Sequence, residues 1–255
     1  MTVNELIAHF QMKRQHALLF YQDLHSLNMQ EYYKKYKKDQ IQIITRFDKF
    51  YPILLKQIYD PPWVLYYKGD ITLASPKKML AVVDTRKPSQ QAGYKLNVIV
   101  RPLIWNGWCI VSGLAYGIDG MSHRLTLEEQ GKTIAVLGSG FYSIYPTIHT
   151  ELAHHIAEKG LLLSEFRPNQ RPEKWQFPLR NRIISGLSNG TLVVEAQERS
   201  GSLITADLAL EYGREVFAVP GAIFQKESKG TNLLIQQGAK LVLNEKDIIE
   251  ELQFG

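Results

Sequence analysis

Short apolar segments recur along the chain from about residue 79 onward, and stretches with helical spacing separate them. The apolar segments are unbroken rather than alternating, as in strands of a sheet that helices cover on both faces. They span residues 79–83, 109–113, 133–138, 161–165, 191–196, 216–220 and 240–243. The pattern predicts an α/β fold with a doubly wound, mostly parallel sheet of the Rossmann kind.

The first part of the chain has a different pattern. Residues 4–38 have helical spacing, prolines interrupt residues 52–62, and residues 63–68 resemble a strand added to an edge of the sheet. We therefore expect a small N-terminal helical domain over residues 1–65 and the Rossmann-like domain over 66–255, with the boundary anywhere from 60 to 75. The basic, aromatic stretch at 32–38 is either a nucleic-acid contact or a solvated helix face.

Composition narrows the class of protein. A chain of 255 residues can bury one α/β core and a small second domain. A formal net charge of +5 permits a nucleic-acid or phosphate partner without requiring one. The single cysteine, Cys109, lies in an apolar stretch and is expected to be a buried structural thiol. No signal-peptide pattern and no apolar run of about 18 residues is found, so we expect a cytoplasmic protein without a membrane span.

Turns that carry glycine or basic residues follow four of the predicted strands, at residues 84–89, 112–119, 138–146 and 199–202. The carboxyl ends of the strands form the ligand crevice of an open α/β sheet, so these turns share one rim. Arg86 and Lys87 precede a predicted helix, where partial positive charge favours an anion. A phosphate-binding face is expected at this rim.

Residues 177–205 (FPLRNRIISGLSNGTLVVEAQERSGSLIT) strengthen the expectation of a polyanion site. Arg180 and Arg182 lie beside an apolar helical run, and Arg199 precedes a Ser-Gly-Ser turn that begins another helix. The structural alternative is that Arg182 is buried against Glu165 or Glu195 and holds the rim of the sheet together. Its mutation would then unfold the protein rather than weaken binding alone.

Catalytic and cofactor motifs are poorly met. The sequence contains no G-x-G-x-x-G after its first Rossmann strand, no P-loop and no histidine spacing typical of a metal site, so no cofactor or metal is expected. Asp119, Glu165 and Glu195 lie near strand ends. Such carboxylates more often accept hydrogen bonds from turn amides, or form ion pairs with arginines, than take part in catalysis. We therefore predict that the chain is not an enzyme.

The motifs FPLRNRIISGL and RSGSLITA, together with TRKPS, VSGLAYGID and GKTIAVLGSG, resemble the DNA-processing protein A family, also called DprA or Smf. The resemblance covers roughly three-quarters of the chain. It implies an extended Rossmann fold behind a SAM-like N-terminal helical domain, without the C-terminal winged helix that some members carry. It also implies a homodimer that binds single-stranded DNA without sequence preference. Such a protein loads a RecA-type recombinase during natural transformation, past the single-strand-binding protein.

On this basis we expect basic side chains and turn amides to cradle the phosphates of a single strand, with Phe141 or Tyr142 stacking on a base. The two aromatics are equally suited to ordinary packing. The expected DNA-binding residues are Arg86, Lys87, Ser112, Gly113, Ala115, Gly138, Gly140, Phe141, Arg180, Asn181, Arg182, Arg199 and Ser200. The expected dimer interface contains Leu233, Leu234 and Ile235, although Leu233 and Leu234 are also suited to covering the last strand.

Two residues depart from the family pattern. Asp84 replaces the glycine that usually follows the first Rossmann strand, and Thr147 replaces a lysine that often follows Tyr-Pro. Asp84 adds a negative charge beside Arg86 and Thr147 removes a positive one, so weaker phosphate binding is expected unless Lys87 and Arg182 compensate.

The competing hypothesis is a Rossmann-type nucleotide-binding enzyme, similar to the phosphoribohydrolases, or a regulator that binds free nucleotide. The PGGxGT signature of those hydrolases is missing.

Overall fold

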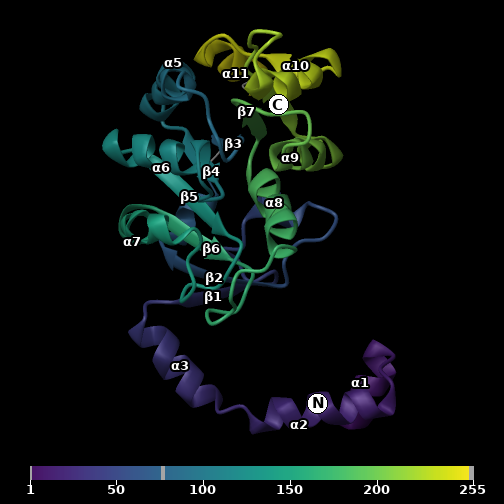
Figure 1. Cartoon of the computed structure of the whole chain (residues 1–255). Coiled ribbons are helices and arrows are strands. Elements are labelled where there is room, and N and C mark those ends of the chain that lie inside the picture. The colour runs from purple at the N-terminus through teal and green to yellow at the C-terminus, as the bar shows by residue number, and fades with distance from the viewer. Residues whose placement is uncertain (1, 76–77, 253–255) are drawn as a thin grey trace. The chain divides into compact units, whose positions relative to one another are not determined.

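The computed structural model describes residues 2–75 and 78–252 (Figure 1). It divides into two compact units, Met1–Gln42 and Ile43–Gly255. The division precedes the boundary expected at residue 65, because most of the intervening segment joins the large unit. That segment contains most of β1 (Gln42–Thr45), all of α4 (Ile53–Lys56) and the start of β2 (Val64–Gly69).

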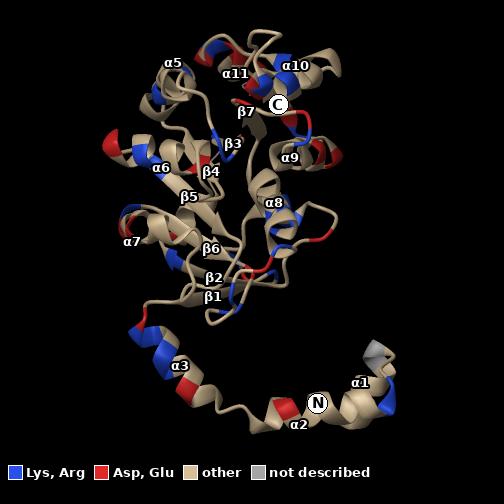
Figure 2. Cartoon of the chain, in the orientation of Figure 1, with Lys and Arg blue, Asp and Glu red and all other residues tan. Residues whose placement is uncertain are grey.

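The N-terminal unit consists of α1 (Val3–Phe10), α2 (Arg14–Ser26) and α3 (Met29–Lys38). The helical expectation for residues 4–38 is confirmed, with breaks between the helices. A capping box begins α1: the Thr2 hydroxyl accepts the Glu5 N–H at 3.3 Å, and the Glu5 carboxylate accepts the Thr2 N–H at 2.7 Å. None of the α3 side chains is buried, and its lysines follow one another along the helix (Figure 2). This exposure favours a solvated helix face, and the SAM-like assignment of the unit stays a prediction.

The large unit contains a nine-stranded sheet in the order β1-β2-β6-β5-β4-β3-β7-β8-β9. All seven strands predicted from apolar segments are present. The eighth, expected over 63–68, is β2, which pairs antiparallel with β6 and is followed by the outermost strand β1. The seven are β3 (Met79–Val83), β4 (Cys109–Ser112), β5 (Lys132–Leu137), β6 (Leu161–Ser164), β7 (Gly190–Val193), β8 (Glu215–Ala218) and β9 (Lys240–Leu241).

The strand order reverses direction at β3. The chain proceeds from β3 through β4, β5 and β6 on one side, and then returns to place β7, β8 and β9 on the other side, all with parallel pairing. This is the order of a Rossmann sheet extended by three strands, and the predicted fold class is confirmed. The reversal creates a topological switch point at the carboxyl ends of β3 and β7, where α/β sheets bind ligands.

Successive residues of each strand point to opposite faces, which produces two cores. Met79, Ala81 and Val83 of β3 pack with residues of α8 and α9, whereas Leu80 and Val82 pack with residues of α5 and α6. Figure 1 shows the two helical layers on either side of the sheet. The remaining helices are α5 (Ala92–Trp105), α6 (Ile118–Glu128), α7 (Thr150–Lys159), α8 (Gln176–Leu187), α9 (Gly201–Glu211), α10 (Lys229–Gln236) and α11 (Glu245–Leu252), with short 3₁₀ turns at Ile71–Ala74, Thr147–His149 and Lys226–Ser228.

Cys109 is fully buried in the core, where burial raises the pKa of its thiol to about 12, as expected for a structural thiol. Among residues 2–75 and 78–252, no helix has both the length and the apolar character needed to cross a bilayer.

Candidate functional site

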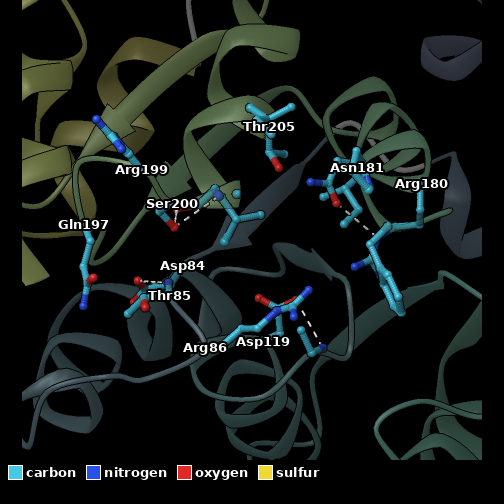
Figure 3. Close-up of a pocket in the computed structure, with 18 of the residues that line it drawn as sticks. Asp84, Thr85, Arg86, Asp119, Arg180, Asn181, Gln197, Arg199, Ser200 and Thr205 are labelled. Carbon is cyan, nitrogen blue, oxygen red and sulfur yellow. Dashed lines mark hydrogen bonds between the residues drawn. The ribbon is translucent and has the colours of Figure 1, made fainter. Parts of the chain in front are cut away.

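A cavity of about 540 Å³ lies at the switch point (Figure 3). Its walls come from four segments: the loop after β3, the turn after β4, the first half of α8 and the start of α9. Five basic side chains line it against two carboxyl groups, so its lining favours an anion. The basic residues are Arg86, Lys87, Lys174, Arg180 and Arg199, and the acidic ones are Asp84 and Asp119.

Arg180 fixes α8 above the sheet. Its side chain is buried, and its guanidinium donates hydrogen bonds to the carbonyl oxygens of Gly113, at 2.5 Å, and Val136. A glycine is required at 113, because a Cβ there would lie 2.5 Å from the guanidinium. Burial lowers the pKa of Arg180 to about 10, against the opposing effect of Asp119, so Arg180 is charged at neutral pH.

Arg182 lies outside the cavity. It follows Arg180 by two residues, which is about 200° around a helix, so the two side chains leave α8 in nearly opposite directions. Its Nη2 donates to the Glu165 carboxylate at 2.7 Å, and its Nε lies 3.6 Å from an Asp60 carboxylate oxygen. The structural alternative is therefore confirmed with Glu165 as the partner. Arg182 does not compensate for charge in the cavity, whereas Lys87 does line it.

The start of α9 supplies a helix N-terminus to the cavity. Ser200 is the N-cap residue, and its hydroxyl accepts the N–H of Ser202 at 3.3 Å. Ser200, Gly201, Ser202 and Thr205 all line the cavity, so the positive end of the helix dipole faces it. Arg86 and Lys87, by contrast, do not begin a helix, because α5 starts only at Ala92.

Exposed groups complete the mouth of the cavity. Arg86 and Arg199 are exposed, and the guanidinium of Arg86 lies 5.7 Å from the centre of the Phe177 ring. Asn181 also lines the cavity, and its side-chain oxygen accepts the Nε–H of Arg180 at 3.2 Å. The aromatic ring of the cavity is thus that of Phe177.

The turn after β4 does not offer its amides as expected. The Asp119 carboxylate accepts the N–H groups of Gly113, at 3.1 Å, and of Ala115, at 3.3 Å. Burial raises the pKa of Asp119, while Arg180 and these amides act in the opposite direction. Ser112 is fully buried outside the cavity, where its hydroxyl donates to the Val82 carbonyl at 2.6 Å. Asp119 therefore holds this turn in place through its amides. Of the predicted contacts Ser112, Gly113 and Ala115, only Ala115 lines the main cavity.

The turn after β5 likewise lies away from the cavity. The N–H of Gly140 donates to the Gln170 carbonyl at 2.9 Å, and Gly138 packs beside the ring of Phe177. Phe141 is 8% exposed, with the ammonium of Lys68 at 5.8 Å from its ring centre. Tyr142 is more exposed, but it does not line the cavity either. Gly138, Gly140 and Phe141 thus serve packing here, and their predicted contact with DNA has no support from this geometry.

The two departures from the family pattern have unequal consequences. Thr147 begins a 3₁₀ turn and does not line the cavity. Asp84 does line it, and burial, with Glu195 and Asp119 nearby, raises its pKa to about 9 although the Thr85 N–H opposes the shift. This raised pKa favours the protonated carboxyl at neutral pH, so the geometry gives no support to the negative charge expected beside Arg86.

The three carboxylates considered for catalysis all have partners. Asp119 holds turn amides, Glu165 pairs with Arg182, and buried Glu195 accepts the Ser89 N–H and the Lys95 ammonium, each at 2.8 Å. The pairing of Glu195 with Lys95 had not been anticipated. Within the part of the chain that the structure describes, no group of three His, Cys, Asp or Glu residues is arranged to hold a metal ion.

Sequence reasoning missed several members of the site. Lys174 lines the cavity from the segment that leads into α8, and Phe177 lines it from the first turn of that helix. Gln197 and Thr205 line it from either side of Ser200. Phe177 is the first residue of the arginine-bearing run at 177–182, and Lys174 lies shortly before that run. Their position in the same segment was the available signal.

The fold and the site together define a Rossmann-like protein with a cationic cavity at the switch point of its sheet. The family model described as "DNA recombination-mediator protein A" matches residues 42–253, and the chain belongs to that family. It is 51% identical over 217 residues to the DNA processing protein DprA of Bacillus subtilis (strain 168), covering 85% of this chain and 73% of the relative. It is 46% identical over 214 residues to the protein Smf of Escherichia coli (strain K12), covering 84% and 57%.

Two solved structures are similar over most of their length. The DNA processing protein A of Streptococcus pneumoniae matches with a TM-score of 0.85 and 40% identity, covering 92% of this chain and 82% of that one. The DNA processing protein A of Helicobacter pylori, described for its single-stranded DNA binding mode, matches with a TM-score of 0.75 and 31% identity, covering 84% and 96%.

Proposed function

We propose that the cavity binds single-stranded DNA through its phosphates. The observation that carries this proposal is the placement of five basic side chains and the N-terminus of α9 around one cavity at the switch point. Cations and helix N-termini both bind phosphate, and neither distinguishes one base from another. The strand is therefore held without sequence preference and with a strong dependence on salt.

The cavity suits a short piece of a single strand. Its volume of about 540 Å³ lies in the range of small-molecule sites, which admits a flexible strand and not a duplex. Phe177, with the Arg86 guanidinium beside its ring, offers one base a stacking surface, worth about 1–3 kcal/mol. Arg86, Lys87, Lys174 and Arg199 bind phosphates directly, while Arg180 mainly holds the wall in place.

The wider role rests on membership of the family. In this proposal the chain acts as a mediator that loads a RecA-type recombinase onto single-stranded DNA during natural transformation, where the single-strand-binding protein must be displaced. It works as a homodimer in the cytoplasm and catalyses no reaction. The engagement of Asp119, Glu165 and Glu195 by internal partners supports binding rather than hydrolysis.

Fluorescence anisotropy of a labelled oligo-dT at several salt concentrations tests the proposal. Arg86→Ala is expected to weaken binding about tenfold and to reduce the slope of log affinity against log salt by about 0.7, because one phosphate contact is lost. Lys132→Ala is the matched control, since Lys132 is exposed at the amino end of β5, away from the cavity. Equal affinity and equal salt slope in the Arg86→Ala and control variants would contradict the assignment.

Mononucleotides are the competitors that separate the alternatives. A binding protein for single strands releases its oligonucleotide to a mononucleotide only at high concentration. A free-nucleotide regulator releases it readily, and a phosphoribohydrolase-like enzyme also liberates free base, which chromatography detects.

A further inference from the structure

The carboxyl group of Asp84 belongs to the wall of the cavity and has one oxygen without a partner. Asp84 directly follows β3, and its Oδ1 accepts a hydrogen bond from the Thr85 N–H. Its Oδ2 is buried and has no hydrogen-bond partner among the described residues. A buried carboxyl oxygen left in this state is costly unless a ligand completes it.

We propose that Asp84 is a phosphate-binding residue of the cavity, whose protonated carboxyl donates a hydrogen bond from Oδ2 to a phosphate oxygen. This deepens the proposed function and rests on it. Asp84 lies at the switch point, in the same loop as Arg86 and Lys87, where a phosphate held by those residues comes close to it. The torsion that orients an aspartate carboxyl is soft, so a small rotation brings Oδ2 toward the ligand.

The groups around Asp84 explain why the proton stays in place. Asp119 of α6 and Glu195, in the loop after β7, both raise the pKa of Asp84. Lys95 of α5 opposes them, but its ammonium is held by Glu195 at 2.8 Å. Together with burial, which is the largest effect, these carboxylates raise the pKa of Asp84 to about 9.

A bound phosphate adds another negative charge beside Asp84 and favours the protonated carboxyl further. The ionised carboxylate, in contrast, has no proton to donate and repels the phosphate. Affinity for a polyanion must therefore fall as the pH rises through the pKa of Asp84. With that pKa at about 9, roughly one molecule in eleven stays protonated at pH 10, so binding at pH 10 is expected to be about tenfold weaker than at pH 7.

The test compares the wild-type chain with Asp84→Asn between about pH 7 and about pH 10 at constant ionic strength. The probe is a labelled oligo-dA, because adenine does not titrate in this range. Asparagine has nearly the same shape and an amide N–H that donates, but it does not ionise. Arg180, with a pKa of about 10, loses charge toward pH 10 in both proteins alike. Asp84→Asn is therefore expected to bind like the wild type at pH 7 and about tenfold more tightly than the wild type at pH 10. Asp84→Gly, which lacks the donor, is expected to bind several-fold more weakly than Asp84→Asn at pH 7.

Melting curves of all three proteins across the same range confirm that each is folded where binding is measured. Parallel pH profiles for the wild type and Asp84→Asn would overturn the inference while leaving DNA binding intact. Loss of binding by every protein at every pH would instead remove the proposed function, and the inference with it. An affinity of Asp84→Gly equal to that of Asp84→Asn at neutral pH would also count against a donated hydrogen bond.

Discussion

The guanidinium of Arg180 donates a hydrogen bond to the carbonyl oxygen of Gly113 across 2.5 Å, and this contact joins α8 to the turn after β4. The same guanidinium also donates to the carbonyl oxygen of Val136 beyond β4, at β5. One buried cation thus ties a helix to two neighbouring strands at the edge of the cavity. The charge of Arg180 therefore mainly stabilises the fold at the cavity and contributes less to ligand binding.

Arg180→Met is expected to lower the free energy of unfolding by about 3 kcal/mol, because it leaves buried carbonyl oxygens without donors. Arg180→Lys should restore little of this, since a lysine lacks the planar fork that reaches both carbonyls. Urea unfolding followed by circular dichroism measures both variants. A stability of Arg180→Met within about 0.5 kcal/mol of the wild type would show that the contact contributes little.

Arg182→Met is expected to affect stability and not binding. Its loss leaves Glu165 without its partner at 2.7 Å, which should cost about 2–4 kcal/mol of unfolding free energy. Affinity for oligo-dT, measured below the melting range, should stay within about twofold of the wild type, because Arg182 lies outside the cavity. The Glu165→Gln variant and the double variant complete a cycle, and additive effects would mean that the two residues are not coupled.

Asp84→Asn is expected to stabilise the free protein at neutral pH. The Asp84 pKa is about 9 in the folded chain against 3.8 for the free group, so the folded state binds one more proton between those values. Stability contributed by this proton is present at low pH and is lost progressively as the pH rises toward 9. Replacing Asp84 should raise the free energy of unfolding by roughly 2–4 kcal/mol at pH 7 and flatten its decline with pH.

Urea titrations of the wild type and Asp84→Asn at a series of pH values provide the measurement. If the difference in unfolding free energy between the wild type and Asp84→Asn is the same at about pH 5 as at about pH 8, then Asp84 titrates normally in the folded chain.

The residues of the expected dimer interface differ in exposure along α10. Leu234 is 5% exposed and packs in the core of its own chain, whereas Leu233 is 38% exposed. Leu234→Ala should therefore lower stability by about 2–4 kcal/mol whatever the oligomeric state. Leu233→Glu should leave the monomer folded and convert a dimer to monomers in light scattering at two concentrations. A wild-type chain that is monomeric at both concentrations would remove the interface.

Much of the fold could be predicted because buried parallel strands appear in the sequence as unbroken runs of apolar residues. Met79–Val83 is an example whose predicted and observed bounds agree. β1 was missed, since Gln42–Thr45 mixes exposed and buried residues and lies at the outer edge. The compact units divide at this short strand, where the sheet begins, whereas the sequence pattern places the boundary later, at residues 60–75.

The site was predicted in outline, and its errors have a common origin. Glycine turns at strand ends were expected to offer free amides, but the sequence does not reveal that Asp119 and the Gln170 carbonyl already bind them. The sequence does not distinguish the roles of Arg180 and Arg182. Their angular separation on α8 directs one side chain toward the cavity and the other toward Glu165. The charge state of Asp84 depends on burial, which no local pattern records.

The walls of the cavity come from residues 83–87, 115–119, 174–184 and 197–205, which adjoin one another only after β3, β4 and β7 have paired. The unfolded chain therefore has no equivalent site, and a ligand of this cavity binds the native state alone. By mass action, such a ligand draws the folding equilibrium toward the native protein, with about 2.7 kcal/mol of added stability at a hundredfold excess over its dissociation constant. Ligand binding in the cavity and stability against unfolding are thus thermodynamically linked, so either measurement reports on the other.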